Sequence, residues 1–192
     1  ADKDFQLASG ISDKIEENSS IWHISRARLP WLLIGMLGGT FSAQVISGFE
    51  SSISNVPALA FFIPLITAMG GNVGVQSSAI VVQALAKGGS FTSSILKKLS
   101  KELTVGLLNG ILCSLVVLMI STFFADVKVG ITVSLSLLVV MVFAAVMGSL
   151  IPLVMDKYKI DPALATGPFV TTLNDVLGLF IYFTVGLLLF NF

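Results

Sequence analysis

The chain has 192 residues, of which 55% are hydrophobic and only 11% are charged, and its mean hydropathy is +0.95. Soluble globular domains carry about 25% charged residues, so this composition excludes that class and predicts an integral membrane protein. Basic and acidic residues balance, and no basic patch supports nucleic-acid binding. The single cysteine, Cys113, excludes a disulfide framework.

The N-terminal residues 1–28 have mixed charge and precede the first apolar segment. Ile11, Ile15 and Trp22 are spaced like the apolar face of a helix, so we predict a cytoplasmic amphipathic segment on the membrane surface. The segment has no apolar h-region, and we expect no cleavable signal peptide. His23, the sole histidine, is interpreted as an interfacial side chain and not as a ligand.

Five long apolar segments follow, and each has at least the roughly 20 residues that a membrane-spanning helix needs. They are residues 29–49, 55–86, 103–125, 129–155 and 162–192. The predicted fold class is therefore an all-α integral membrane protein, with five transmembrane helices in one domain, 29–192. The second segment is longer than necessary and contains prolines and glycines, so we expect a tilted, kinked or partly unwound helix.

The charges between the segments indicate the orientation. Basic residues gather before the first segment, between the second and third, and between the fourth and fifth: Arg26, Arg28, Lys87, Lys97, Lys98, Lys101, Lys157 and Lys159. The alternate connections hold only Glu50 in one, and Asp126 with Lys128 in the other. By the positive-inside rule, we predict a plasma-membrane protein with a cytoplasmic N-terminus and an external C-terminus.

Asp175 is the one charged residue inside the five segments. Helical rise places it roughly 20 Å from Asp161 and roughly 25 Å from the C-terminus, which is near the bilayer midplane. An ionisable group at that depth costs at least about 2.5–3.5 kcal/mol unless water, a cation or a partner compensates it. We therefore interpret Asp175 as a functional residue.

The neighbours of Asp175 and one stretch of the second segment supply neutral oxygens. Thr171 and Gly178 share a helix face with Asp175, and residues 67–78 include Asn72 and Gln76 at i,i+4 spacing. One carboxylate with neutral oxygens, and no nearby His or Cys, suits a hard cation such as Mg²⁺ or Ca²⁺ that keeps much of its water. The same small residues are also typical of a helix-packing seam, and the pattern leaves both interpretations open.

An internal echo links the second and fifth segments. Pro57-Ala-Leu-Ala recurs as Pro162-Ala-Leu-Ala, and each is followed by a second proline. The two segments run in opposite directions in the predicted topology. The echo therefore suggests the inverted-repeat symmetry that, in transporters, places a site between broken helices at the midplane.

Two long motifs, residues 55–77 and 161–179, resemble the membrane domain of the MgtE magnesium channels, and the resemblance extends over about residues 26–192. It implies a homodimeric cation channel with five helices per subunit and a pore lined by the second and fifth. It also implies a hydrated Mg²⁺ held by Asp175, with a backbone carbonyl from Gly71 and with Thr171 beside the ion. Together with Asn72 and Gly74 from the same stretch, these residues form the predicted metal site.

The leading functional hypothesis is passive conduction of Mg²⁺ down its electrochemical gradient, with Mn²⁺ or Ca²⁺ as further permeant ions. The alternative is a proton- or sodium-coupled cation transporter. An aspartyl protease would need a second carboxylate from a symmetric partner, so we expect no enzyme. The large cytosolic N-terminal domain and paired CBS domains of MgtE channels have no counterpart here, and residues 1–25 are expected to match the connecting helix.

Overall fold

The computed structural model describes residues 10–13, 15–87 and 95–190, and this part of the chain contains helices, turns and no strand. In chain order the elements, with η for 3₁₀ helices, are α2 (Ile21–Gly48), α3 (Glu50–Asn55), η1 (Pro57–Phe62), α4 (Ile63–Ala86), α5 (Ile95–Phe124), α6 (Val127–Lys157), η2 (Pro162–Ala165) and α7 (Pro168–Phe190). Five of the described helical segments are long and apolar enough to span a membrane. The predicted all-α membrane fold with five transmembrane helices is confirmed.

Two helices begin earlier than the predicted apolar segments. α2 begins at Ile21 and not at residue 29, and α5 begins at Ile95 and not at residue 103. A charged residue ends an apolar run but not a helix, because the backbone hydrogen bonds continue into the polar interface. Glu102, predicted to lie outside the membrane segments, is instead buried within α5, with 8% of its surface exposed.

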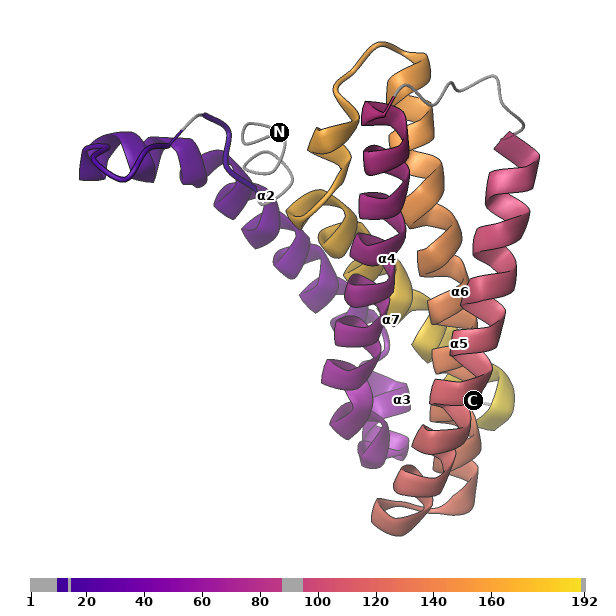
Figure 1. Ribbon diagram of the computed structural model, residues 1–192. Helices are drawn as coiled ribbons and strands as arrows, with labels where there is room; N and C mark the ends of the chain where they lie inside the picture. Colours follow the sequence, from indigo (N-terminus) through magenta and orange to yellow (C-terminus); the bar gives the residue numbers. More distant parts are fainter. Residues whose placement is uncertain (1–9, 14, 88–94, 191–192) are drawn as a thin grey trace.

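α6 is the central helix, and α4, α5 and α7 pack around it (Figure 1). Its Leu137, Val140 and Met141 belong to the buried core, which Leu179 and Phe183 of α7 complete. Small residues let the helices approach closely, as they do in other membrane bundles. This packing fixes α4 and α7 relative to each other, and the candidate site lies between these two helices.

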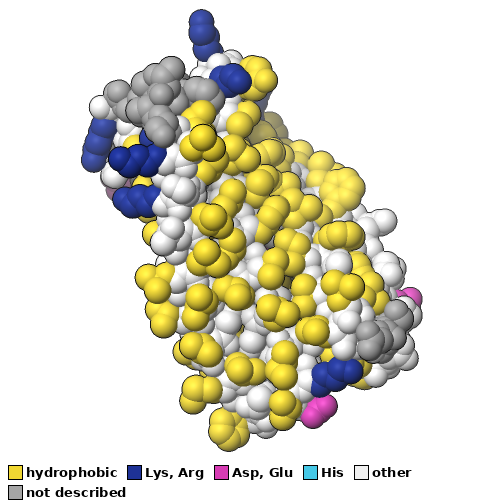
Figure 2. Space-filling view, turned by 90° about the vertical axis from the view of Figure 1, so that its right-hand side faces the viewer, with side chains coloured by type: hydrophobic (Ala, Val, Ile, Leu, Met, Phe, Trp, Pro, Cys, Tyr) yellow, Lys and Arg dark blue, Asp and Glu magenta, His cyan; other side chains and the backbone are white. Residues whose placement is uncertain are grey.

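The outer face of α5 is apolar along its length. Leu108, Leu112, Leu115, Met119 and Phe123 are all exposed. Figure 2 shows this side of the molecule, where hydrophobic side chains cover the middle and charged side chains lie toward the ends. A continuous apolar exterior between charged ends is what a bilayer requires of a spanning protein.

α2 leans away from the other helices (Figure 1). Only Ala27, Trp31 and Gly38 of its 28 residues are buried. The helix contains Pro30, which lacks an N–H and bends helices, and the first turns of α2 point in a different direction from the rest. α2 is therefore the most exposed of the five long helices.

The two copies of the echo adopt the same local structure. Pro57–Phe62 and Pro162–Ala165 are both 3₁₀ helices, and they precede α4 and α7, which run in opposite directions (Figure 1). The second segment is thus partly irregular at its start, as expected, but its glycine-rich part is a continuous α-helix. The buried hydroxyl of Tyr182 donates to the carbonyl of Leu59 at 2.8 Å and ties η1 to α7.

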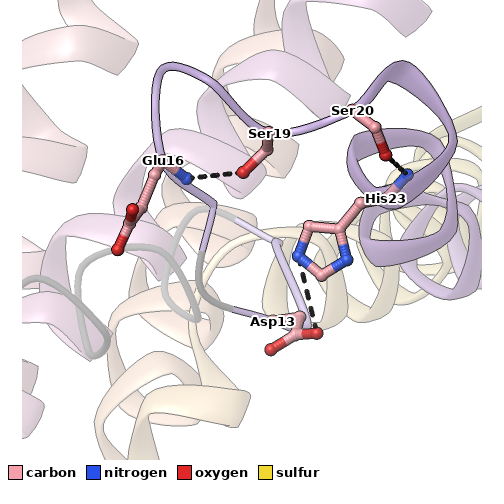
Figure 3. Close-up of polar contacts among 5 residues, drawn as sticks. All are labelled: Asp13, Glu16, Ser19, Ser20 and His23. Atoms are coloured by element: carbon pink, nitrogen blue, oxygen red, sulfur yellow. Dashed lines mark hydrogen bonds and ion pairs between the residues drawn. The ribbon is translucent and has the colours of Figure 1, made fainter.

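The described part of the N-terminal segment folds as turns and not as a helix before Ile21. In the described residues the helical spacing of Ile11, Ile15 and Trp22 thus corresponds to a helix only from Ile21 onward, and residues 1–9 and 14 lie outside the described chain. The amphipathic surface segment over residues 1–28 stays a prediction. Ser20 caps α2 by accepting from the His23 amide, and His23 Nε2 lies 3.7 Å from Asp13 Oδ2 (Figure 3). The segment is held to the start of α2, because the Ser12 amide also donates to the Ala27 carbonyl at 2.9 Å.

Candidate cation site

A cavity of about 490 Å³ lies between α4 and α7. Its lining residues are Pro64, Thr67, Ala68, Gly71, Asn72, Val75, Gln76, Thr171 and Asp175. The seven from α4 recur every three or four residues and form one stripe along the helix, since 3.6 residues complete a turn. The two from α7 are one turn apart. Helical periodicity thus gathers amide and hydroxyl groups on one face of α4, and the packing of the helices turns this face toward the carboxylate of α7.

Gly71 gives Asp175 its space. A Cβ atom at Gly71 would lie 3.6 Å from Asp175 Oδ1 and only 3.1 Å from Thr171 Cγ2. Any side chain larger than hydrogen would therefore press on Thr171 and occupy volume beside the carboxylate. The backbone of α4 can approach α7 at this level because the residue is glycine.

The threonines in the cavity wall have already used their hydroxyl protons. Thr171 donates to the Gly167 carbonyl at 3.0 Å, and Thr67 donates to the Ile63 carbonyl at 3.2 Å. Their oxygens keep lone pairs that accept hydrogen bonds. Asp175 is an acceptor, and the side-chain amides of Asn72 and Gln76 each contribute an acceptor oxygen. Acceptors suit a hydrated cation, because its water molecules direct their hydrogens outward.

The charge of the site comes from one residue. No Lys or Arg is among the lining residues, and within the described ranges Asp175 forms no ion pair and no hydrogen bond. The same part of the chain holds no group of three or more His, Cys, Asp or Glu side chains that suits a metal ion. A cation in this cavity would therefore meet one carboxylate and several neutral oxygens of this chain.

Four of the five predicted site residues come together here. Asp175, Thr171, Gly71 and Asn72 all line the cavity. Gly74 is not among the lining residues, because it points toward α7 at the edge of this stripe, where a Cβ atom would overlap the Asn174 amide nitrogen. Its predicted place in the metal site stays a prediction.

Thr67 and Gln76 also line the cavity. Gln76 was named with Asn72 as a source of neutral oxygens but was not included in the predicted metal site, and Thr67 was not singled out. Asn174, next to Asp175, is buried against Gly74 with 1% exposure. Neither its Oδ1 nor its Nδ2 has a hydrogen-bond partner in the described structure. No sequence pattern indicated which way this side chain would turn.

Comparison with known proteins agrees with this arrangement. The family model MgtE, described as a divalent cation transporter, matches residues 63–185, a range that contains every lining residue of the cavity. The chain belongs to the MgtE family. The resemblance stated from the two sequence motifs is thereby confirmed, and the MgtE family is one of transporters and not of enzymes.

Three curated MgtE proteins, each named magnesium transporter, are similar over most of this chain. The protein from Bacillus subtilis is 34% identical over 97% of the chain, and that from Enterococcus faecalis is 34% identical over 97%. The protein from Thermus thermophilus is 36% identical over 85%. The aligned regions cover 42%, 41% and 36% of these relatives, so the chain spans about two-fifths of their length.

Proposed function

We propose that the chain is the membrane unit of a Mg²⁺ channel and that a hydrated Mg²⁺ passes through the cavity beside Asp175. The observation that carries the proposal is the convergence of one carboxylate and several acceptor oxygens in an otherwise apolar bundle. Mg²⁺ loses water reluctantly, so a site that offers acceptors to its hydration shell matches its chemistry. The three relatives named as magnesium transporters support the choice of ion.

The carboxylate would attract the ion, and the membrane potential would drive it. Each elementary charge gains about 2.3 kcal/mol per 100 mV, so a divalent ion gains roughly twice that on entering a negative interior. Neutral oxygens from Thr171, Asn72 and the Gly71 backbone would hold the water shell without adding negative charge. A moderate affinity of this kind permits the ion to leave as well as to enter.

We propose further that two chains face each other across this cavity. Within one chain only α4 and α7 line it, so a second copy would supply the remaining wall and a second Asp175. The pore would then be lined by α4 and α7 of both chains. The orientation follows the distribution of basic residues, with the N-terminus cytoplasmic and the C-terminus outside.

The test is Mg²⁺ flux into proteoliposomes. Asp175→Ala and Asp175→Asn should each lower the flux by at least about tenfold, the factor that corresponds to 1.4 kcal/mol of ion binding. Asp126→Asn is the matched control, because Asp126 is exposed and its side chain makes no capping hydrogen bond. This control should conduct like the unaltered protein.

Two outcomes would contradict the proposal. Unchanged Mg²⁺ flux and unchanged discrimination against Ca²⁺ in Asp175→Ala would remove the carboxylate from the mechanism. A flux that collapses when proton and sodium gradients are abolished would indicate the coupled transporter instead. Crystals grown in Mn²⁺ offer an independent check, because the anomalous signal should lie within about 6 Å of the Asp175 carboxylate, one water shell away.

A further inference from the structure

A second feature lies on the side of α7 that does not face the candidate cation cavity. It is a groove between α2 and α7, which we call the α2–α7 seam. Two cavities follow each other along these two helices. The first, of about 550 Å³, lies where the N-terminal segment also meets the two helices, and its lining residues are Gly10, Ile11, Arg28, Trp31, Leu32, Gly35 and Pro168, the first residue of α7. The second, of about 300 Å³, is lined almost wholly by apolar side chains of both helices, among them Phe41.

The seam is open because α2 touches α7 closely at one level. Gly38 lies directly against Thr172, and a Cβ atom at Gly38 would overlap the threonine methyl group. On the N-terminal side of this crossing α2 leans outward (Figure 1), whereas on the other side Val45 and Ile46 of α2 pack against the core that α7 helps to form. The space on either side of the crossing lies at membrane depth, where lipid is the surrounding solvent.

The end of the seam near the N-terminus presents two hydrogen-bond donors without acceptors. The Arg28 side chain is exposed and has no acidic partner in the described ranges. Trp31 is 9% exposed, and its Nε1–H has no acceptor in the same part of the structure. A buried donor without an acceptor is unfavourable. The Trp31 Nε1 atom is itself inaccessible to solvent, so the group that can meet an anion in this cavity is the exposed Arg28 guanidinium. A guanidinium suits an anion with several oxygens, such as a phosphate group.

The apolar remainder of the seam has the length of one leaflet. Trp31 and Phe41 are ten residues apart, or roughly 15 Å along the helix, and half of a 30 Å hydrocarbon core is about the same. The ligand that fits therefore has an anionic head and a hydrocarbon tail. We propose that the α2–α7 seam binds an anionic phospholipid, with the phosphate at Arg28 and an acyl chain in the second cavity.

A lipid in the seam would touch α7, the helix that carries Asp175. Pro168 lines the first cavity, and Phe169, Thr172 and Val176 line the second. A bound lipid would thus contact α7 over more than two turns on the side away from the cation cavity. The inference concerns lipid binding alone and does not depend on Mg²⁺ conduction.

The two tryptophans of the chain allow a direct test. Trp22→Phe leaves Trp31 as the sole tryptophan, and its fluorescence is measured in phosphatidylcholine vesicles that contain a minor fraction of brominated lipid. Phosphatidylglycerol brominated near the headgroup should quench Trp31 as strongly as a roughly fivefold larger fraction of brominated phosphatidylcholine. That factor corresponds to about 1 kcal/mol for one basic side chain at an anionic surface.

Matched variants separate a built site from general attraction to the membrane. Arg28→Gln should remove the preference for phosphatidylglycerol, whereas Arg26→Gln, which alters an exposed arginine outside both cavities, should retain it. Gly35→Leu should fill the first cavity and lower quenching by the anionic lipid. Gly39→Leu is its control, because a Cβ atom added at either glycine would have no neighbour within 4 Å and Gly39 lines neither cavity.

Three results would overturn the inference. Equal quenching by the two brominated lipids would remove the selectivity, and an undiminished preference in Arg28→Gln would remove the phosphate contact. Weak quenching by both lipids, relieved when the protein is diluted to monomers, would show that a second copy of the chain covers the seam.

Discussion

α4 has one face that lines the cation cavity and one face that packs against α6 and α7, and glycines occur on both. On the cavity face, Gly71 leaves room beside Asp175. On the packing face, Gly74 lies so close to Gly148 of α6 that a Cβ atom on Gly148 would overlap the Gly74 carbonyl. The same residue type thus creates open volume on one face and removes it on the other.

Because of this difference, we expect residues on the cavity face to affect ion flux and residues on the packing face to affect the stability of the bundle. Enlarging a residue on the packing face forces two backbones apart, whereas enlarging one on the cavity face displaces water or an ion. Mutations on the two faces should therefore affect different measurements. The following changes test that separation, from the largest expected effect to the smallest.

Gly148→Ala should destabilise the bundle most. Its added methyl group meets the backbone of Gly74, including the Cα atom at 2.9 Å, and a backbone yields less readily than a side chain. We expect a loss at the upper end of the about 1–3 kcal/mol typical of overpacking, measured as thermal denaturation in detergent. Gly39→Ala, which has no neighbour within 4 Å, is the control. A denaturation midpoint in Gly148→Ala that equals the control would contradict the close contact.

Tyr182→Phe should have an intermediate effect. It removes the 2.8 Å hydrogen bond to the Leu59 carbonyl while it keeps the ring that packs in the core. We expect a loss of about 1 kcal/mol in the same thermal measurement, the usual net worth of one hydrogen bond. Thr184→Val, which removes a hydroxyl bonded to its own helix, is the comparison and should cost less. Equal losses of stability in both variants would show that the hydrogen bond between Tyr182 and Leu59 does not stabilise the bundle.

Gly71→Ala and Gly70→Ala form the sharpest pair, with the smallest effect on stability. In each, the new Cβ lies 3.1 Å from one methyl group, on Thr171 for Gly71 and on Val140 for Gly70. Alanine favours the helix by up to about 1 kcal/mol and offsets this contact, so both should denature near the original temperature. Only Gly71→Ala should reduce Mg²⁺ flux severalfold in proteoliposomes. Equal flux in the two variants would place the ion path elsewhere.

Much of the fold could be predicted because burial in a bilayer leaves a strong signal. Long uncharged runs predicted the five membrane-spanning helices. They did not predict the residue at which each helix begins. α5 continues two turns beyond its apolar run, into a region that contains Lys97 and Lys98, since interfacial lysines satisfy both helix and water. α3 was missed because its six residues include only one apolar side chain, that of Ile53, and so carry no periodic pattern.

The site was predicted in part for a related reason. Asp175 was predicted because it is the one charged residue in a long apolar segment. Thr171 was predicted because it lies four residues before Asp175, which is one helical turn along the same face. Which side of α4 faces the cavity does not follow from spacing alone, because Gly71 and Gly74 differ by only about 60° around the helix axis. Packing against α6 decides that rotation, and it turns Gly74 toward Asn174. Tertiary contacts of this kind are invisible in a single sequence.

The hydrogen bond between Tyr182 and Leu59 also bears on the ion path proposed above. Tyr182 lies seven residues beyond Asp175, which is two turns and roughly 10.5 Å along the same face of α7. At that level the face is covered, because η1 folds over the ring and leaves both residues almost fully buried. An ion travelling along this face from Asp175 toward the C-terminal end would reach a hydrogen-bonded backbone turn before it reached water. On the path proposed above, the main chain of η1 would therefore lie between Asp175 and this end of α7.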